Sequence, residues 1–164
     1  MGTLLNKLNE KNVFENVVIP TGALDGIIAP GMYYPNLDGE KGFISTTLPI
    51  VEPLFMEKEP VWHDFDQICY FSGGDGNHMD QLGGVVEFSL GDEEGNLEKF
   101  IITKPTMFYI KAGMIHCPLN FIEVFDPKKP ILFQDFTFAS VYRRYRPGSN
   151  EPLNDKFEPI EKTW

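Results

Sequence analysis

Residues 109–120 read YIKAGMIHCPLN, an apolar run that meets a glycine turn and is followed three residues later by His116. Glycine tolerates the positive φ of a tight turn, so Gly113 predicts a sharp reversal just before the histidine. The chain is otherwise poor in histidine, because only His63 and His78 accompany His116. The chemistry of this protein is therefore expected around this segment.

A second segment, residues 61–73, reads VWHDFDQICYFSG and joins His63 to an aromatic strand. On a straight strand His63 and Gln67 would share a face but stand about 13 Å apart, at ~3.3 Å per residue. Aspartate readily adopts turn conformations, so the DFD at residues 64–66 predicts a bend that brings the two side chains together. A short helix over residues 62–67 would have the same effect, and the β-rich run that follows favours the bend.

Residues 109–120 resemble the second motif of the cupin superfamily, which runs Pro-x-Gly-x-x-His-x-x-x-Asn. Gly113, His116 and Asn120 match it in place, whereas Lys111 stands where proline is usual. The resemblance implies an all-β fold, a cupin-type, jelly-roll-like barrel of antiparallel strands with its site inside the wider mouth.

Residues 61–73 resemble the first cupin motif, His-x-His-x-x-x-Glu followed by an aromatic strand and a glycine. His63 takes the second histidine position and Gln67 the glutamate position, while Val61 stands where the first histidine belongs. The resemblance therefore implies a metal site reduced to His63, Gln67 and His116.

Two imidazoles and one amide oxygen suit a borderline divalent transition metal such as iron, manganese, nickel or zinc. No carboxylate in this set neutralises the ion, so the site favours an anionic, metal-chelating ligand such as a carboxylate, an oxo acid or an enediol. The alternative is a pair of hydrogen-bonded histidines in a barrel that binds no metal.

Two further residues are candidates for catalytic proton transfer. Glu87 is acidic within an apolar strand and would serve as the missing carboxylate or a general base, unless it faces outward. His78 lies in a loop between the motifs and would join the site only if that loop folds over the mouth. Arg143, Arg144 and Arg146 would either clamp an anionic substrate or form ion pairs at the surface or an interface.

The length of 164 residues predicts one domain. We expect an N-terminal helix, at residues 3–15, and an extended arm within residues 1–41, a barrel over 42–146 and a polar tail over 147–164. Short segments rich in β-branched and aromatic residues between glycine and proline turns predict the strands. These are residues 42–51, 67–72, 84–90, 99–103, 106–110 and 131–144.

The chain is acidic, with 14 Lys and Arg against 24 Asp and Glu, a net charge of −10. This charge repels phosphate backbones and anionic membranes, so neither nucleic acid nor membrane is an expected partner. No apolar run approaches a signal-peptide core or the roughly 20 residues of a membrane span, which predicts a cytoplasmic protein. Cys69 and Cys117 form no CxxC pair and are expected to be buried thiols. A homodimer is expected through edge strands or exchanged N-terminal segments, as is common for cupin barrels.

The sequence thus predicts a metal-dependent enzyme acting on a small anionic metabolite by isomerase, lyase or dioxygenase chemistry. The alternative is a non-catalytic cupin module that binds a small ligand, which the loss of the first histidine and the glutamate favours. Turnover needs a titratable group near the substrate, so the hypotheses separate on whether Glu87, His78 or Asp66 points into the barrel. A storage barrel rests on fold analogy alone.

Overall fold

The computed structural model describes residues 17–19, 28–34, 42–92 and 94–153. These residues form β-strands and no α-helix, and the predicted N-terminal helix falls outside them. Within these ranges no helix has the length and hydropathy needed to cross a membrane. The strands are β1 (Val17–Ile19), β2 (Gly31–Tyr34), β3 (Ile44–Ile50), β4 (Leu54–Glu57), β5 (Gln67–Gly73), β6 (Gly84–Gly91), β7 (Leu97–Ile102), β8 (Thr106–Ile110), β9 (His116–Val124) and β10 (Ile131–Thr137).

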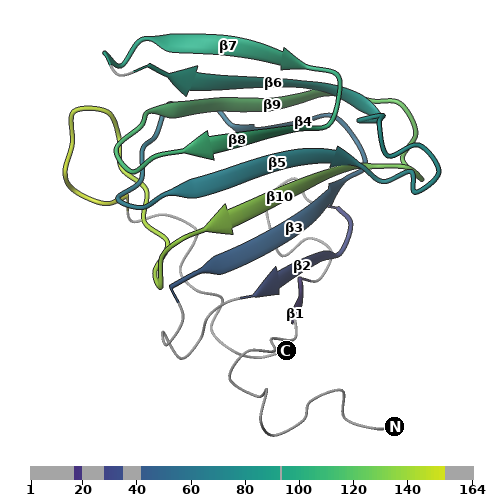
Figure 1. Ribbon diagram of the computed structural model, residues 1–164, viewed down its shortest axis with the longest axis horizontal. Coiled ribbons are helices and arrows are strands. Elements are labelled where there is room, and N and C mark those ends of the chain that lie inside the picture. The colour runs from purple at the N-terminus through teal and green to yellow at the C-terminus, as the bar shows by residue number, and fades with distance from the viewer. Residues whose placement is uncertain (1–16, 20–27, 35–41, 93, 154–164) are drawn as a thin grey trace, which may run out of the picture.

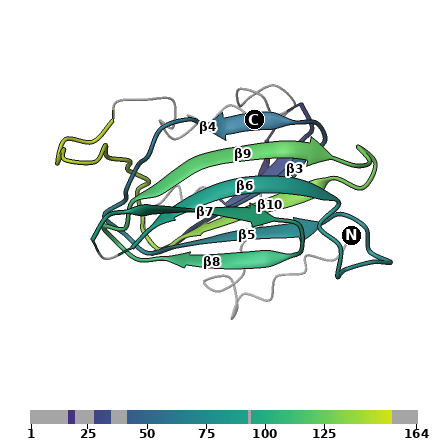
Figure 2. The ribbon, with the colours of Figure 1, turned by 90° about the horizontal axis from the view of Figure 1, so that it is seen from above.

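The strands form two antiparallel sheets (Figure 1). One has the order β1-β2-β3-β10-β5-β8 and the other β4-β9-β6-β7. The strand sets β3-β10-β5-β8 and β4-β9-β6-β7 form the two four-stranded sheets of a jelly roll, the architecture of cupin barrels. Figure 2 views the same barrel from above. The predicted all-β, cupin-type fold is confirmed.

The core lies between the sheets and is built by the alternation of each strand. Inward-facing Phe71 of β5 is 0% exposed, as is Phe121 of β9. The Phe71 ring centroid lies 5.8 Å from that of Phe88 and 5.3 Å from that of Phe133, so aromatic rings from both sheets meet at one point.

The observed strands agree with the predicted ones at β3, β5, β6, β7 and β8. The predicted strand over residues 131–144 is too long, because β10 ends at Thr137 and the chain then turns across the barrel mouth. The sequence did not predict the short strands β1, β2 and β4, and it did not predict β9, because Pro118 and Asn120 are poor strand formers. Cys117, with φ of +69°, lies where the register between β6 and β9 shifts, so β9 begins irregularly.

The barrel has two ends of different character. At the histidine end, which contains His63 and His116, β5 and β9 begin while β6 and β10 finish. At the loop end are the β5–β6 connection, residues 74–83, and the β9–β10 turn, residues 125–130. Antiparallel pairing keeps the two ends apart by the length of β5, seven residues or roughly 23 Å.

Candidate functional site

Backbone pairing brings the two predicted histidine segments together. Val61 and His116 form an antiparallel bridge, and each backbone N–H donates to the carbonyl of the other at 2.9 Å. Gly113, with φ of +83°, makes the predicted turn and donates its N–H to the His63 carbonyl at 2.7 Å. As a result the ring centroids of His63 and His116 lie 4.8 Å apart. Val61, in place of the first motif histidine, is buried in the core.

The tautomers of both imidazoles are set by backbone carbonyls. His63 Nδ1 lies 2.6 Å from the Arg143 carbonyl oxygen, and His116 Nδ1 lies 3.1 Å from that of Met114. A carbonyl oxygen only accepts hydrogen bonds, so each Nδ1 carries the proton. Each Nε2 is then left with a lone pair, the usual second-shell arrangement of a histidine that binds a metal.

Both imidazoles are neutral at physiological pH. The exposed fraction is 2% for His63 and 3% for His116. Burial lowers the pKa of His63 to about 3, with a further contribution from His116. Burial likewise lowers the pKa of His116 to about 4, and the Arg144 guanidinium adds to the effect. Neutral imidazole is the form that coordinates a metal ion.

Gln67 and Asp135 form a buried polar pair at the same end of the barrel. Gln67, 2% exposed at the start of β5, donates from Nε2 to Asp135 Oδ2 at 2.9 Å. Its Oε1 is buried and accepts no hydrogen bond. Burial raises the pKa of Asp135 to about 6, although hydrogen bonds from Gln67 and Thr137 act in the opposite direction. Asp135 can therefore hold or release a proton near neutral pH.

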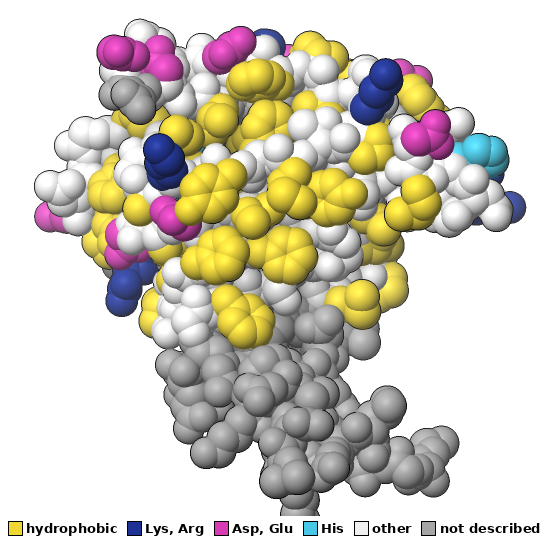
Figure 3. Space-filling view, viewed as in Figure 1, with side chains coloured by type: hydrophobic (Ala, Val, Ile, Leu, Met, Phe, Trp, Pro, Cys, Tyr) yellow, Lys and Arg dark blue, Asp and Glu magenta, His cyan; other side chains and the backbone are white. Residues whose placement is uncertain are grey.

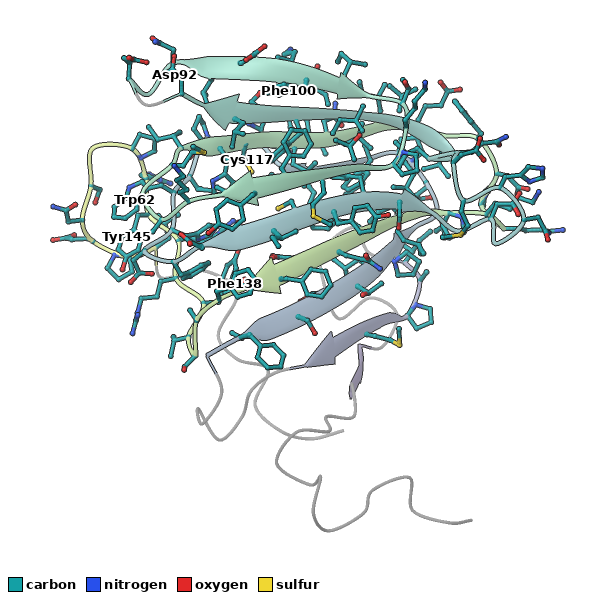
Figure 4. All side chains as sticks on the ribbon, in the orientation of Figure 1. Trp62, Asp92, Phe100, Cys117, Phe138 and Tyr145 are labelled. Carbon is teal, nitrogen blue, oxygen red and sulfur yellow. The ribbon has the colours of Figure 1, made fainter. Side chains whose placement is uncertain are left out.

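The segment that follows β10, residues 138–153, crosses the histidine end, and we call it the strap. Trp62 and Tyr145 stack with ring centroids 4.2 Å apart, and they lie side by side in Figure 4. Their backbones exchange two hydrogen bonds of 2.9 Å, and the Tyr145 hydroxyl donates to Asp64 at 3.1 Å. The strap is thereby fixed to the segment that carries His63.

The strap places two hydrogen-bonding groups beside the His63 ring. Besides the Arg143 carbonyl at Nδ1, the Tyr142 hydroxyl lies 3.5 Å from Nε2. Burial raises the pKa of Tyr142 well above its usual range, and the nearby Asp135 carboxylate adds to this shift. Tyr142 therefore remains a neutral hydroxyl beside the imidazole lone pair.

The three arginines of the strap form ion pairs within the chain. Arg144 pairs with Glu57 at the end of β4, where their side chains are 13% and 23% exposed. Arg143 pairs with Asp64 at 3.4 Å, and Arg146 pairs with Glu59 at 3.6 Å. The last two pairs lie at the surface, whereas Arg144 is close enough to the histidines to influence both pKa values.

The structure separates Glu87 and His78 from the two histidines. Glu87 alternates with buried Val86 and Phe88 on β6, so it faces outward, and it pairs with Lys99 at 3.1 Å. His78 is exposed in the β5–β6 connection at the loop end, where its Nδ1 lies 2.9 Å from Asp75. The bend at residues 64–66 is present, and Asp66 is used in holding the turn before His116 through a hydrogen bond from the Ala112 N–H at 2.9 Å.

Sequence reasoning missed Asp135 and Tyr142. Strand alternation was the signal for Asp135, since Ile131, Phe133 and Thr137 are the buried residues of β10 and Asp135 shares their face. No local pattern marks Tyr142, because it lies beyond the end of the strand. The predicted buried thiols are observed: Cys69 and Cys117 are buried and free, and burial raises the pKa of both.

Across the described part of the chain, no cluster of three or more His, Cys, Asp or Glu side chains is arranged to hold a metal ion. A metal site at the histidine end would therefore combine the two imidazoles with donors other than these four residue types. Gln67 Oε1 fits this requirement, because it is a buried acceptor that lacks a donor.

No protein-family model and no curated protein sequence matches the chain. Solved structures of oxalate decarboxylase are similar to it. The Bacillus subtilis enzyme at pH 4.6 is 13% identical with a TM-score of 0.47, over 71% of this chain and 27% of that one. A structure addressing the substrate binding mode of oxalate decarboxylase is 12% identical with a TM-score of 0.45, over 80% and 30%. One addressing the Mn(II) centres of the B. subtilis enzyme is 12% identical with a TM-score of 0.44, over 78% and 29%.

The chain thus spans less than a third of the length of these proteins. Likeness at this level carries no conclusion about the substrate or the metal of this chain. The fold assignment rests on the strand order of the two sheets.

Proposed function

We propose that the histidine end binds a divalent transition metal and that the protein is a metal-dependent enzyme acting on a small, anionic, metal-chelating metabolite. The observation that carries the proposal is the state of the two imidazoles. His63 and His116 are buried and neutral, and each is held through Nδ1 by a backbone carbonyl. Each ring thereby presents a lone pair at Nε2, and that of His63 faces the Tyr142 hydroxyl at 3.5 Å.

Gln67 Oε1 is the third proposed ligand. A buried amide oxygen without a donor costs roughly 1–3 kcal/mol, and a cation would remove that cost. The hydrogen bond from Gln67 Nε2 to Asp135 orients the amide so that Oε1 is the atom left over. Asp135 would act in this way as a second-shell group, which fixes a ligand without binding the ion itself.

This donor set is neutral, so a bound dication keeps its full charge and favours an anionic substrate that completes the coordination shell. When bound, such an ion supplies Lewis-acid polarisation of a carbonyl or enediol oxygen. The isomerase, lyase and dioxygenase classes of chemistry all use that property.

Within this proposal, the residues of the chain handle the proton. Asp135 is a candidate proton carrier because its pKa of about 6 lies near neutrality. The Tyr142 hydroxyl beside His63 Nε2 can donate a hydrogen bond to a substrate oxygen. Arg144 contributes positive charge close to both imidazoles and favours an anionic ligand. We thus propose Asp135 and Tyr142 for the catalytic roles that the sequence suggested for Glu87 and His78.

The test is elemental analysis of the protein purified without a tag or chelator, beside the His63→Ala and His78→Ala variants. We expect about one equivalent of iron, manganese, nickel or zinc in the parent protein and in His78→Ala, and none in His63→Ala. Absence of metal from the parent protein, including after anaerobic reconstitution, would contradict the proposal. A metal retained by His63→Ala would place the site elsewhere.

The second candidate function is a non-catalytic module that binds a small ligand. It is favoured by the engagement of Asp135, whose oxygens accept hydrogen bonds from Gln67 and Thr137 and are less available to a substrate. A panel of carboxylates, oxo acids and enediols, assayed both for binding and for turnover, separates the two. Binding without turnover by the metal-loaded protein supports the module.

A further inference from the structure

On the outer face of the six-stranded sheet, the strands β3, β10, β5 and β8 carry no charged side chain. Its centre is made by Leu132, Phe136, Ile68, Tyr70, Met107 and Tyr109, which we call the apolar face. The other outward residues of these strands are serine, threonine, proline and glutamine. Figure 3 looks onto this side and shows hydrophobic side chains gathered over β8, β5 and β10, with charged side chains around them.

The residues of the apolar face lie in neighbouring rows across the sheet, with Gln134 beside Tyr70 in the second row. Phe136 lies opposite Ile68, which lies opposite Tyr109, and in the next row Tyr70 lies opposite Met107. Three of these side chains remain strongly exposed: Met107 is 57% exposed, Tyr109 52% and Phe136 38%. Aromatic residues and methionine are the types enriched at protein interfaces.

The outer face of the other sheet has a different composition. Glu87 and Lys99 form an ion pair there, and Glu123 is exposed on β9. This face also carries exposed apolar side chains, Leu97, Ile101 and Ile122 among them, so the two faces differ in charge rather than in apolar content. Of the two outer faces, that of the six-stranded sheet is the one whose strands lack charge. An exposed apolar surface of this kind is typical of a docking surface.

We propose that the apolar face is the interface between two copies of this chain. Each copy carries a net charge of −10, so two copies repel one another across any acidic surface. A two-fold interface brings the same patch of both subunits together and must be self-complementary. A face whose strands carry no charge meets this condition over its centre, because no like charges face each other there, and the Asp66 carboxylate that accepts a hydrogen bond from Tyr109 lies at its rim.

The size of the face is adequate for such an interface. Five strands, β2 with the four named above, span about 24 Å at ~4.8 Å per strand, and seven residues extend about 23 Å. The projected area is therefore roughly 500 Å², and the accessible area of protruding side chains is larger. A standard interface buries about 800 Å² per partner, so the face is of the right order. This arrangement replaces the edge-strand pairing expected from the sequence.

The experiment is analytical ultracentrifugation of the full chain between 1 and 100 µM, orders of magnitude at which specific dimers form. We expect a dimer, and a Met107→Glu/Phe136→Glu variant that dissociates at least about 100-fold more readily because four carboxylates would oppose one another. The matched control is Ile101→Glu, which adds a charge at an equally exposed site, 57%, on the outer face of the other sheet. Ile101→Glu should remain a dimer, and thermal melting should show that all variants are folded.

A monomeric parent protein at 100 µM would overturn the proposal and would leave the face to a different occupant, either another protein or residues 1–16 of the chain itself. A dimer that persists in the double variant, or one that dissociates with Ile101→Glu, would place the interface on another surface. Metal content at the histidine end is an independent readout, so failure of either proposal can be recognised without the other.

Discussion

The two ends of the barrel both combine aspartate with histidine, but their aspartates differ in charge state. At the loop end, Asp75 accepts hydrogen bonds from the exposed side chains of His78 and Lys129, at 2.9 and 2.8 Å. These partners, Lys129 foremost, hold the pKa of Asp75 far below its usual range, so it is a carboxylate. At the histidine end, burial raises the pKa of Asp135 and lowers those of His63 and His116.

The ion pair at the loop end and the candidate site at the histidine end contain similar residue types. They differ in how deeply those residues are buried. The solvated pair at the loop end uses charge, because water stabilises ions there. The buried groups at the histidine end are kept near neutrality, which prepares imidazoles to bind a metal and a carboxyl group to hold a proton. Four predictions follow from the contrast between the ends, the first concerning metal affinity.

The largest difference is expected in metal affinity. His116→Ala removes a proposed ligand, and we expect the affinity for Zn²⁺ to fall by at least about 100-fold, since loss of second-shell partners alone costs 10–100-fold. His78→Ala should bind Zn²⁺ as the parent protein does, because His78 lies at the other end of the barrel. Competition against a chromophoric chelator measures both. Equal affinities in the two variants would mean that the buried pair is not the metal site.

A smaller difference is expected when one ion pair at each end is broken. Glu57→Ala removes the carboxylate that pairs with the Arg144 guanidinium, at a position where the arginine side chain is 13% exposed. We expect a loss of about 2 kcal/mol in the free energy of unfolding, less than for a fully buried pair. Lys129→Ala breaks an exposed pair and should change the melting temperature by no more than about 2 °C. Urea titration and thermal melting test the pair, and similar losses at both ends would contradict the contrast.

The pH dependence of the metal-free protein is a further test. Folding lowers the pKa of each histidine from 6.5. Below about pH 6.5 both histidines are therefore protonated in the unfolded chain and neutral in the folded chain. Asp135 has its pKa raised from 3.8 to about 6, so in the same window the folded chain holds a proton that the unfolded chain lacks. The unfolded chain thus binds about two protons on the histidines, and the folded chain binds about one on Asp135. The unfolded chain therefore carries about one proton more. Stability should fall by about 1.4 kcal/mol per pH unit as the pH drops from 6 to 5.

The Asp135→Asn variant sharpens this test. It removes the proton uptake that opposes the histidines, so the slope between pH 6 and 5 should about double, to roughly 2.7 kcal/mol per pH unit. Urea unfolding at several pH values in the presence of a chelator measures both slopes. A flat profile in the parent protein, or an unchanged slope in the variant, would show that these groups are not buried as described.

The smallest effect is expected from Asp75→Asn at the loop end. This carboxylate, whose side chain is 13% exposed, accepts hydrogen bonds from His78 and Lys129, whose side chains are 54% and 52% exposed. Its removal should leave metal affinity unchanged and the melting temperature within about 2 °C of the parent value. A large loss of metal in this variant would connect the two ends and contradict the separation argued above.

Most of the barrel could be predicted from the sequence, because the tendency to form a strand depends on residues that are close together in the chain. Short runs of β-branched and aromatic residues between turns marked β3, β5, β6, β7 and β8. The same local reading extended β10 beyond Thr137, since Phe138 and Val141 fit a strand as well as they fit the strap. It missed β9 because Pro118 is unfavourable in a regular strand, and the register shift that accommodates it is a property of the pairing.

For the candidate site, the turn at Gly113, the bend at residues 64–66 and the histidines that adjoin them were legible in the sequence. Alternation also encoded the inward position of Asp135 on β10. The contacts that give these groups their properties join residues about 80 positions apart, as between His63 and Arg143. The tautomer of His63, the pKa of Asp135 and the outward position of Glu87 were decided only by the tertiary structure. The physical reason is that desolvation and hydrogen bonding depend on what surrounds a side chain in space, which no local pattern records.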